Sequence, residues 1–311
     1  MAIRVGVGDY QYEVAEDWGQ WPVEGTASDV ATDSQGRVYV AVRTPNAEDQ
    51  KTGAMIVFDR EGNHIASWGE DILDGCHGLW ISPKDEVYHT DAGNNTVTKF
   101  TTDGQLLMTI GNKGEWGEQG MPFRSPTRAV ESSGGDIYVS DGYGQNRCHK
   151  FTSTGELILS WGEGDNVYWQ QEVDEKVTGV VGKGPGQFNL PHDIAVDRND
   201  LSYVADRENL RYQVFDPEGK YITEWNNIKW PNDAVIDDDD VMYIAEGGVV
   251  EGADGILMMK LNGEVIGRWG ERGDRPGQWR GAPHGMWVDC FGDLYVAEVG
   301  ATQALHKFIR V

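Results

Sequence analysis

The sequence predicts an all-β fold, a six-bladed β-propeller. A unit of roughly 40 to 50 residues recurs six times along the chain. Each unit reads as short strands separated by Asp, Asn or Gly turns, and most units close on the dipeptide Trp-Gly. Four strands per repeat at this spacing are typical of radial sheets arranged around a central channel.

The first strand of each repeat is short and apolar, and it leads into an Asp, Asn or Gly turn. Because equivalent positions in a closed ring of repeats point to a shared axis, residues from different repeats are expected to meet near the start of this strand. The six repeats start near Ala27, Cys76, Pro126, Pro191, Pro231 and Pro283.

The second strand of each repeat has a core that begins with tyrosine and in which side chains alternate in character. This period of two is typical of half-buried strands. The cores are Tyr39–Ala41, Tyr88–Thr90, Tyr138–Ser140, Tyr203–Ala205, Tyr243–Ala245 and Tyr295–Ala297.

The third strand ends in Phe or Leu, and the fourth ends on a large apolar residue that we expect to pack between neighbouring sheets. This packing explains much of the count of 12 tryptophans, so most of the aromatic content is structural. The closing residues are Trp68, Ile110, Trp161, Trp225 and Trp269.

The sixth repeat stops at Val311 after three strands. Its missing outer strand is predicted at Tyr12 to Trp18, because the ending of this segment matches the fourth strands elsewhere. Such an exchange joins the two termini and removes an exposed sheet edge. We therefore expect residues 1–311 to form a single six-bladed domain.

Charge and hydropathy narrow the range of partners. A net charge of -25 disfavours nucleic acid and anionic membrane surfaces, both of which would repel the chain. No apolar run is long enough to span a bilayer, and the first residues lack the apolar core of a signal peptide, so we expect a cytoplasmic protein. Three cysteines do not indicate a disulfide framework. The expected partner is a small-molecule or short peptide-like substrate.

Two stretches interrupt the repeat, residues 112–123 and residues 163–188. Insertions in propellers form loops at the ends of blades, where they wall a channel mouth. They are therefore candidate lids.

Histidine alternates with small polar residues at the second position of the repeats. Alternate blades lie about 120° apart, so three imidazoles converge and leave a coordination position open, as in catalytic zinc sites. Three imidazoles also suit iron, nickel or copper. Without a metal, the same histidines would pack or hydrogen-bond in the channel, but their clustered lone pairs would then need other partners. The second positions are Ser28, His77, Thr127, His192, Asn232 and His284.

Three segments carry a family resemblance: VSDGYGQNR at residues 139–147, GQFNLPH at residues 186–192 and VADREN at residues 204–209. Together they are similar to the lyase domain of the peptidylglycine α-amidating enzymes, which is a six-bladed propeller of NHL-type repeats. The similarity runs over nearly the whole chain. It implies a zinc lyase that cleaves the carbon-nitrogen bond of an α-hydroxyglycine and releases an amide and glyoxylate. The implied zinc ligands are His77, His192 and His284, and the implied catalytic residues are Tyr143, Arg43 and Arg207.

These residue types suit the implied reaction. A carbinolamide collapses when its hydroxyl loses a proton and its nitrogen departs, so a Lewis acid and a nearby base both lower the barrier. Tyr143 would be the base, and Arg43 and Arg207 would hold a carboxylate or stabilise the developing alkoxide. The competing interpretations are a turn aromatic for Tyr143 and a salt bridge of Arg207 with Asp206 or Glu208.

The chain departs from the family pattern in two places. Gly144 follows Tyr143, where the family has a disulfide-bonded cysteine. Gly285 follows His284, where the family has an aspartate that helps to bind structural calcium, and this difference argues against a calcium ion. The equivalent position in other repeats is occupied by Asp29, Asp193 and Asp233.

The sequence leaves three functions open. The first is the zinc-dependent lyase. The second is a zinc-dependent hydratase, dehydratase or hydrolase that acts on a small α-hydroxy acid at the same site. The third is a non-enzymatic NHL-type propeller that binds another molecule, although such a protein has no use for histidines in alternate blades.

Overall fold

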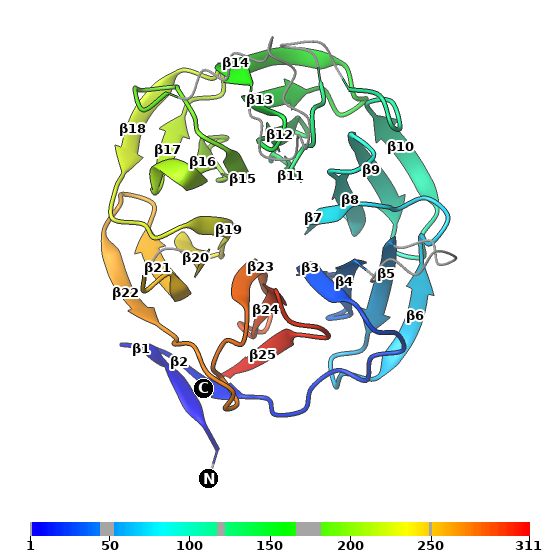
Figure 1. The fold of residues 1–311 in the computed structure, drawn as a ribbon, viewed down its shortest axis with the longest axis vertical. Coiled ribbons are helices and arrows are strands. Elements are labelled where there is room, and N and C mark those ends of the chain that lie inside the picture. The colour runs from blue at the N-terminus through cyan, green and yellow to red at the C-terminus, as the bar shows by residue number, and fades with distance from the viewer. Residues whose placement is uncertain (1, 44–52, 117–121, 166–181, 249–250) are drawn as a thin grey trace.

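The computed structural model is a ring of six antiparallel sheets around a central channel, which confirms the predicted fold (Figure 1). It describes residues 2–43, 53–116, 122–165, 182–248 and 251–311. The first strand of each repeat lies nearest the channel and the fourth lies at the rim. Within the described ranges, the only helical element is one short 3₁₀ turn, and nothing there is a helix capable of crossing a membrane.

The first three repeats form blades 1 to 3, each with its strands in chain order across the sheet. Blade 1 consists of β3 (Thr26–Thr32), β4 (Val38–Arg43), β5 (Gly53–Phe58) and β6 (His64–Trp68). Blade 2 consists of β7 (Cys76–Ile81), β8 (Glu86–Asp91), β9 (Thr96–Thr101) and β10 (Leu106–Ile110). Blade 3 consists of β11 (Arg128–Glu131), β12 (Ile137–Asp141), β13 (Gln145–Phe151) and β14 (Leu157–Asp165).

Blades 4 and 5 repeat this plan, and blade 6 takes strands from both ends of the chain. Blade 4 consists of β15 (Pro191–Val196), β16 (Ser202–Asp206), the 3₁₀ turn η1 (Arg207–Asn209), β17 (Arg211–Phe215) and β18 (Tyr221–Trp225). Blade 5 consists of β19 (Pro231–Ile236), β20 (Val241–Gly247), β21 (Asp254–Lys260) and β22 (Val265–Trp269). Blade 6 consists of β23 (Ala282–Val288), β24 (Leu294–Val299), β25 (Leu305–Arg310), β2 (Tyr10–Val14) and β1 (Arg4–Val7).

The N-terminal segment closes the ring as predicted, but its strand is shorter and earlier than expected. β2 pairs antiparallel with β25, with Val14 opposite Phe308, and β1 adds a fifth strand outside it. β2 ends at Val14, and Asp17 has a left-handed backbone (φ 55°), which a strand does not accommodate. Trp18 therefore lies beyond the strand, where its ring is 5.5 Å from that of Phe58 in blade 1 and 5.5 Å from that of Tyr295 in blade 6.

Large aromatic side chains fill the space between blades. The ring of Trp68, at the end of β6, lies 5.1 Å from that of Phe100 in β9 of the next blade. Trp161 in β14 lies 5.9 Å from Phe215 in β17 in the same way. These contacts confirm the packing predicted for the closing tryptophans. The tyrosines that begin the second-strand cores are also buried: Tyr39, Tyr88, Tyr138, Tyr203, Tyr243 and Tyr295.

Candidate metal centre

Backbone bulges interrupt the first strands where the three repeated histidines stand. In β7, β15 and β23 the pairing with the neighbouring strand is broken at His77, His192 and His284. β3 and β19 show the same break at Ser28 and Asn232. A bulge leaves one residue out of the ladder and redirects its side chain. The local sequence pattern does not reveal these bulges, so the sequence predicts that the histidines converge but not the backbone feature that directs their rings.

The three histidines meet in the channel. The His77 and His192 ring centroids are 4.8 Å apart, and each lies 5.0 Å from the His284 centroid. One ring nitrogen from each residue lies within 4.8 Å of the others, and all three side chains are buried. The convergence expected from alternate blades is therefore present in the structure.

Backbone carbonyl groups of the odd-numbered blades fix the three rings. Nδ1 of His77 lies 2.8 Å from the Thr127 carbonyl oxygen. Nδ1 of His192 lies 2.7 Å from the Asn232 oxygen, and Nδ1 of His284 lies 2.7 Å from the Ser28 oxygen. A carbonyl oxygen only accepts, so each Nδ1–H donates and each Nε2 carries a lone pair. This arrangement sets the tautomer that ligation through Nε2 requires.

The surroundings also keep the imidazoles neutral. Burial, and then the positive charge of Arg43, lower the pKa of His284 to about 3. Burial is likewise the main cause that holds the pKa of His77 and His192 well below the ordinary value, with Arg43 acting on the first and Arg207 on the second. Since a metal binds the deprotonated ring, these shifts leave the ligands ready at neutral pH.

The donor set fits a transition metal ion. The Tyr143 hydroxyl oxygen lies 2.9 Å from His77 Nε2 and 2.8 Å from His192 Nε2. One hydroxyl hydrogen satisfies only one of these two lone pairs, so an imidazole nitrogen remains for another Lewis acid. A cavity of about 10 Å³, room for roughly one water-sized species, lies between the three histidines and the side chains of Asp29, Arg128 and Asp233.

The structure places Tyr143 and Arg43 beside the histidines. Tyr143 follows β12, and its hydroxyl contacts two of the histidine rings, so the interpretation as a mere turn aromatic does not hold. Arg43 ends β4, and its Nε donates to the Cys76 carbonyl oxygen at 2.5 Å, one residue before His77. Both side chains line one cavity with His77.

Arg207 joins the same group from blade 4. Its guanidinium carbon lies 5.7 Å from the Tyr143 ring centre and 5.3 Å from that of Trp230. It also forms the salt bridge anticipated with Glu208, at 2.9 Å, whereas Asp206 pairs with Arg211 at 2.7 Å. The salt bridge and a role at the site are compatible, because the charge of Arg207 still lowers the pKa of His192.

A cavity of about 360 Å³ opens beside His77. It is lined by Arg43, His77 and Tyr143, and also by Trp116 and Ser125, which sequence reasoning did not single out. Trp116 belongs to the insertion at residues 112–123, so the described part of that insertion does wall the site. Residues 117–121 of this insertion, and residues 166–181 of the insertion at 163–188, lie outside the described residues.

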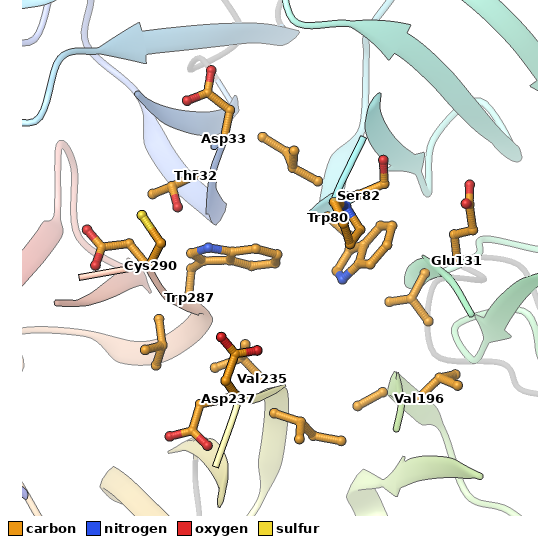
Figure 2. A pocket seen from close by; sticks show the side chains of 18 of the residues that line it. Thr32, Asp33, Trp80, Ser82, Glu131, Val196, Val235, Asp237, Trp287 and Cys290 are labelled. Atoms are coloured by element: carbon orange, nitrogen blue, oxygen red, sulfur yellow. The ribbon is translucent and has the colours of Figure 1, made fainter. Parts of the chain in front are cut away.

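The other ends of the first strands surround a second cavity, of about 390 Å³ (Figure 2). Trp80 from β7 and Trp287 from β23 project into it, and Asp33, Glu131 and Asp237 stand around it. Its described lining contains no histidine. Although this cavity is slightly larger, the three histidines lie at the opposite end of the strands.

Metal removal should leave the fold intact, because sheet pairing and the exchanged strand β2 close the ring. Chelation should preserve the circular dichroism of the β-sheets. The free energy of unfolding should fall by about 3 to 4 kcal/mol when free metal had exceeded its Kd by 100- to 1,000-fold. Loss of the sheet signal on chelation would show instead that the metal is structural.

Comparison with known proteins relates the chain to two groups of relatives. The NHL repeat family matches residues 188–215. "NHL repeat-containing protein 3" of Mus musculus is 30% identical over 301 residues, which is 90% of this chain and 78% of that protein. Its Homo sapiens counterpart is 31% identical over 231 residues, which is 70% of this chain. That match spans 60% of the human protein.

The second group consists of amidating lyases. "Peptidyl-alpha-hydroxyglycine alpha-amidating lyase 1" of Drosophila melanogaster is 33% identical over 165 residues, which is 51% of this chain and 29% of that protein. Among solved structures, a gluconolactonase from Xanthomonas campestris superposes with a TM-score of 0.64 at 12% identity, covering 100% of this chain and 95% of that one. At this identity the likeness concerns the fold alone.

Proposed function

The chain belongs to the family of NHL repeat-containing protein 3, and from this premise and its channel geometry we propose that it is a metal-dependent carbon-nitrogen lyase. The substrate class is an α-hydroxyglycine joined through nitrogen to an acyl or related group. The products are the corresponding amide and glyoxylate. The observation that carries the proposal is the set of three buried imidazoles, whose rings are oriented by backbone carbonyl groups. One tyrosine and two arginines lie beside this set.

The similarity to the Drosophila lyase supports the reaction class, although it covers about half of this chain. Residues His77, His192 and His284 would hold the metal, and their three neutral nitrogen donors suit zinc. When bound, the metal supplies a Lewis acid that lowers the cost of negative charge on the substrate hydroxyl oxygen.

Tyr143 is the group placed to move the proton. Acting as the phenolate, Tyr143 takes the proton from the substrate hydroxyl and becomes a neutral phenol, while the carbon-oxygen double bond forms and the bond from that carbon to nitrogen breaks. The departing nitrogen takes up the proton and leaves as the amide. No water is consumed, so every atom of the substrate appears in the two products. The Tyr143 oxygen already lies beside two of the histidine nitrogens, where the reacting hydroxyl has to be held.

The two arginines hold the carboxylate of the hydroxyglycine. Arg43 and Arg207 come from blades 1 and 4, and both act on the histidines by charge. A guanidinium fork binds a planar carboxylate in a fixed orientation. This contact would present the substrate hydroxyl to Tyr143, and Trp116 lines the same cavity as Arg43 and Tyr143.

Replacement of Arg43 with alanine should lower kcat/KM by about 10- to 100-fold, because a charge-assisted hydrogen bond contributes about 1.5 to 3 kcal/mol. Most of the change should appear in KM, and bound metal should be retained. Steady-state kinetics with elemental analysis checks this. Arg198→Ala, which removes an exposed guanidinium paired with Asp240, is the control and should behave as wild type. Unchanged kinetics in Arg43→Ala would remove Arg43 from the site.

A substrate panel tests the reaction class. It contains an N-acyl-α-hydroxyglycine, a ureido-α-hydroxy acid and a plain α-hydroxy acid, each assayed with zinc. We expect glyoxylate from a nitrogen-linked member. In water labelled with oxygen-18, the released amide should carry no label, whereas hydrolysis of the amide bond would give a labelled carboxylic acid. Water loss from the plain hydroxy acid alone would indicate a dehydratase, and no turnover by metal-loaded protein would indicate a binding propeller.

A further inference from the structure

Directly beside the histidines, the third position of each repeat forms a second layer in the channel. Arg128 of blade 3 is the cation of this layer, and its side chain is buried. Arg128 Nη1 contacts Asp29 Oδ2 and lies 3.1 Å from Asp233 Oδ1. Arg128 Nε lies 3.7 Å from Asp193 Oδ1. The third positions, in chain order, are Asp29, Gly78, Arg128, Asp193, Asp233 and Gly285.

This ion cluster is built on the same backbone that holds the imidazoles. Asp29, Arg128 and Asp233 each follow directly on a residue whose carbonyl oxygen accepts from a histidine ring. The guanidinium group therefore ties together blades 1, 3 and 5, which supply the three acceptors. A shift of any of these strands moves the carbonyl that orients one metal ligand.

The aspartates also hold the strands that carry the histidines. Asp29 Oδ2 accepts from the Leu79 backbone N–H at 2.5 Å, two residues after His77. Asp233 Oδ2 accepts from the Met286 N–H at 2.7 Å, two residues after His284. The cluster thus contacts the strands that carry the histidines and also the segments whose carbonyl groups accept hydrogen bonds from the histidine rings.

Close packing at Gly78 and Gly285 leaves no room for a further side-chain ligand at these two positions of the layer. A Cβ atom at Gly78 would collide with the Thr127 carbonyl oxygen and crowd Arg128, and a Cβ atom at Gly285 would collide with Asp29. An aspartate at position 285, which the amidating-enzyme pattern would place there, therefore does not fit. Three converging carboxylates are a donor set that suits calcium, but the Arg128 guanidinium lies among them.

We infer that Arg128 is an internal cation that replaces a structural divalent ion in this channel and positions the three histidines for metal binding. The part about the histidines rests on the proposed metal centre, whereas the replacement of calcium does not. An isolated group of buried carboxylates would repel one another, so a permanent cation in the chain fixes the layer without an external ion. Arg128 is a positioning residue in this account, because it acts through Asp29, Asp233 and the carbonyl groups.

The first arm of the test measures transition-metal binding by Arg128→Met, which keeps the length of the side chain and removes its charge. Its zinc affinity, from chelator competition, should fall by about 10- to 100-fold, the usual effect of losing a partner of a metal ligand. The visible spectrum of the cobalt-substituted protein should change as well. Wild-type affinity together with a wild-type cobalt spectrum would overturn the positioning role.

Arg211→Met is the matched control. Arg211 is a buried arginine of blade 4 that pairs with Asp206 and Glu224, away from the third-position layer. Its replacement should destabilise the protein and leave the cobalt spectrum unchanged. An equal spectral change in both variants would mean that general destabilisation, and not the cluster, perturbs the ligands. If Arg128→Met does not fold, Asp233→Asn tests the same positioning from the carboxylate side of the cluster, and the same two outcomes apply.

The second arm uses calcium alone and does not depend on the zinc site. The Tm of the wild-type protein should be the same in millimolar calcium and in a calcium chelator. Replacement of Arg128 with glycine opens space among the three carboxylates. Because Arg128 lines the 390 Å³ cavity, calcium can reach this space from that cavity. Calcium should therefore raise the Tm of the Arg128→Gly variant. A calcium-dependent Tm in wild type, or none in a folded Arg128→Gly protein, would contradict the replacement. Wild-type protein that binds no transition metal would refute the proposed function, and this arm would still decide the role of Arg128.

Discussion

Replacement of His192 with alanine should remove most of the bound transition metal. Three imidazoles hold the ion in the account given above, and the two that remain cannot reproduce the site. The loss of affinity should exceed the 10- to 100-fold that follows from losing a second-layer partner. Wild-type protein should carry about one metal ion per chain, and the variant should carry nearly none after dialysis. Elemental analysis measures both directly.

The control for this variant is His64→Ala. His64 begins β6 at the rim of blade 1, and it is exposed, with its Nε2 2.8 Å from the Ser67 hydroxyl. Its replacement should leave metal content at the wild-type value. Circular dichroism should show intact sheets for both variants, because the ring is closed by β2 and not by the metal. A full complement of metal in His192→Ala would eliminate the three-histidine site.

Replacement of Tyr143 with phenylalanine should lower kcat by about 100-fold or more, the usual scale for a lost acid-base group. The phenyl ring keeps the packing of Tyr143 against His77 and His192, whose ring centroids lie 5.1 and 5.4 Å away. Only the hydroxyl that moves the proton is lost. Metal content and Tm should therefore stay close to wild type, and the loss should appear in kcat with little change in KM.

Tyr203→Phe is the matched control for this effect. Tyr203 is also buried, and its hydroxyl donates to Asp197 at 3.1 Å, away from the histidines. Its replacement should cost some stability through the lost hydrogen bond and leave kcat unchanged. If Tyr143→Phe turns over at the wild-type rate, Tyr143 is structural and another group must act as the base.

Much of the fold could be predicted because the same pattern of strands and turns recurs in six repeats. Strand periodicity, the buried tyrosines and the closing tryptophans each recur, so a single irregular copy does not hide the pattern. The position of the exchanged N-terminal strand was harder to predict, because one strand taken from outside the repeats has no second copy for comparison. Its end depends on the backbone of Asp17, and the sequence around Trp18 resembles the other fourth strands.

The convergence of the histidines could be predicted for the same reason. Residues at equivalent positions of alternate blades point to the shared axis of the ring, so their side chains meet there. Tyr143, Arg43 and Arg207 depended on the family resemblance, and the structure brings them to the histidines from three blades.

What the sequence could not provide is the support of the site. The groups that accept hydrogen bonds from the histidines are backbone carbonyls, which every residue has, so the sequence does not show which of them are used. The bulges depend on the pairing between strands, which the sequence also does not show. Arg128 meets its three carboxylates only when blades 1, 3, 4 and 5 close around the channel. Trp116 comes from an insertion, where no repeat constrains the position of a side chain.

The most direct test of the proposed lyase is the simultaneous release of amide and glyoxylate from an N-acyl-α-hydroxyglycine by the zinc-loaded wild-type protein. Both products should appear in equal amounts, chelation should stop their release, and added zinc should restore it. No glyoxylate from this substrate, or glyoxylate release that chelation does not affect, would contradict a metal-dependent carbon-nitrogen lyase.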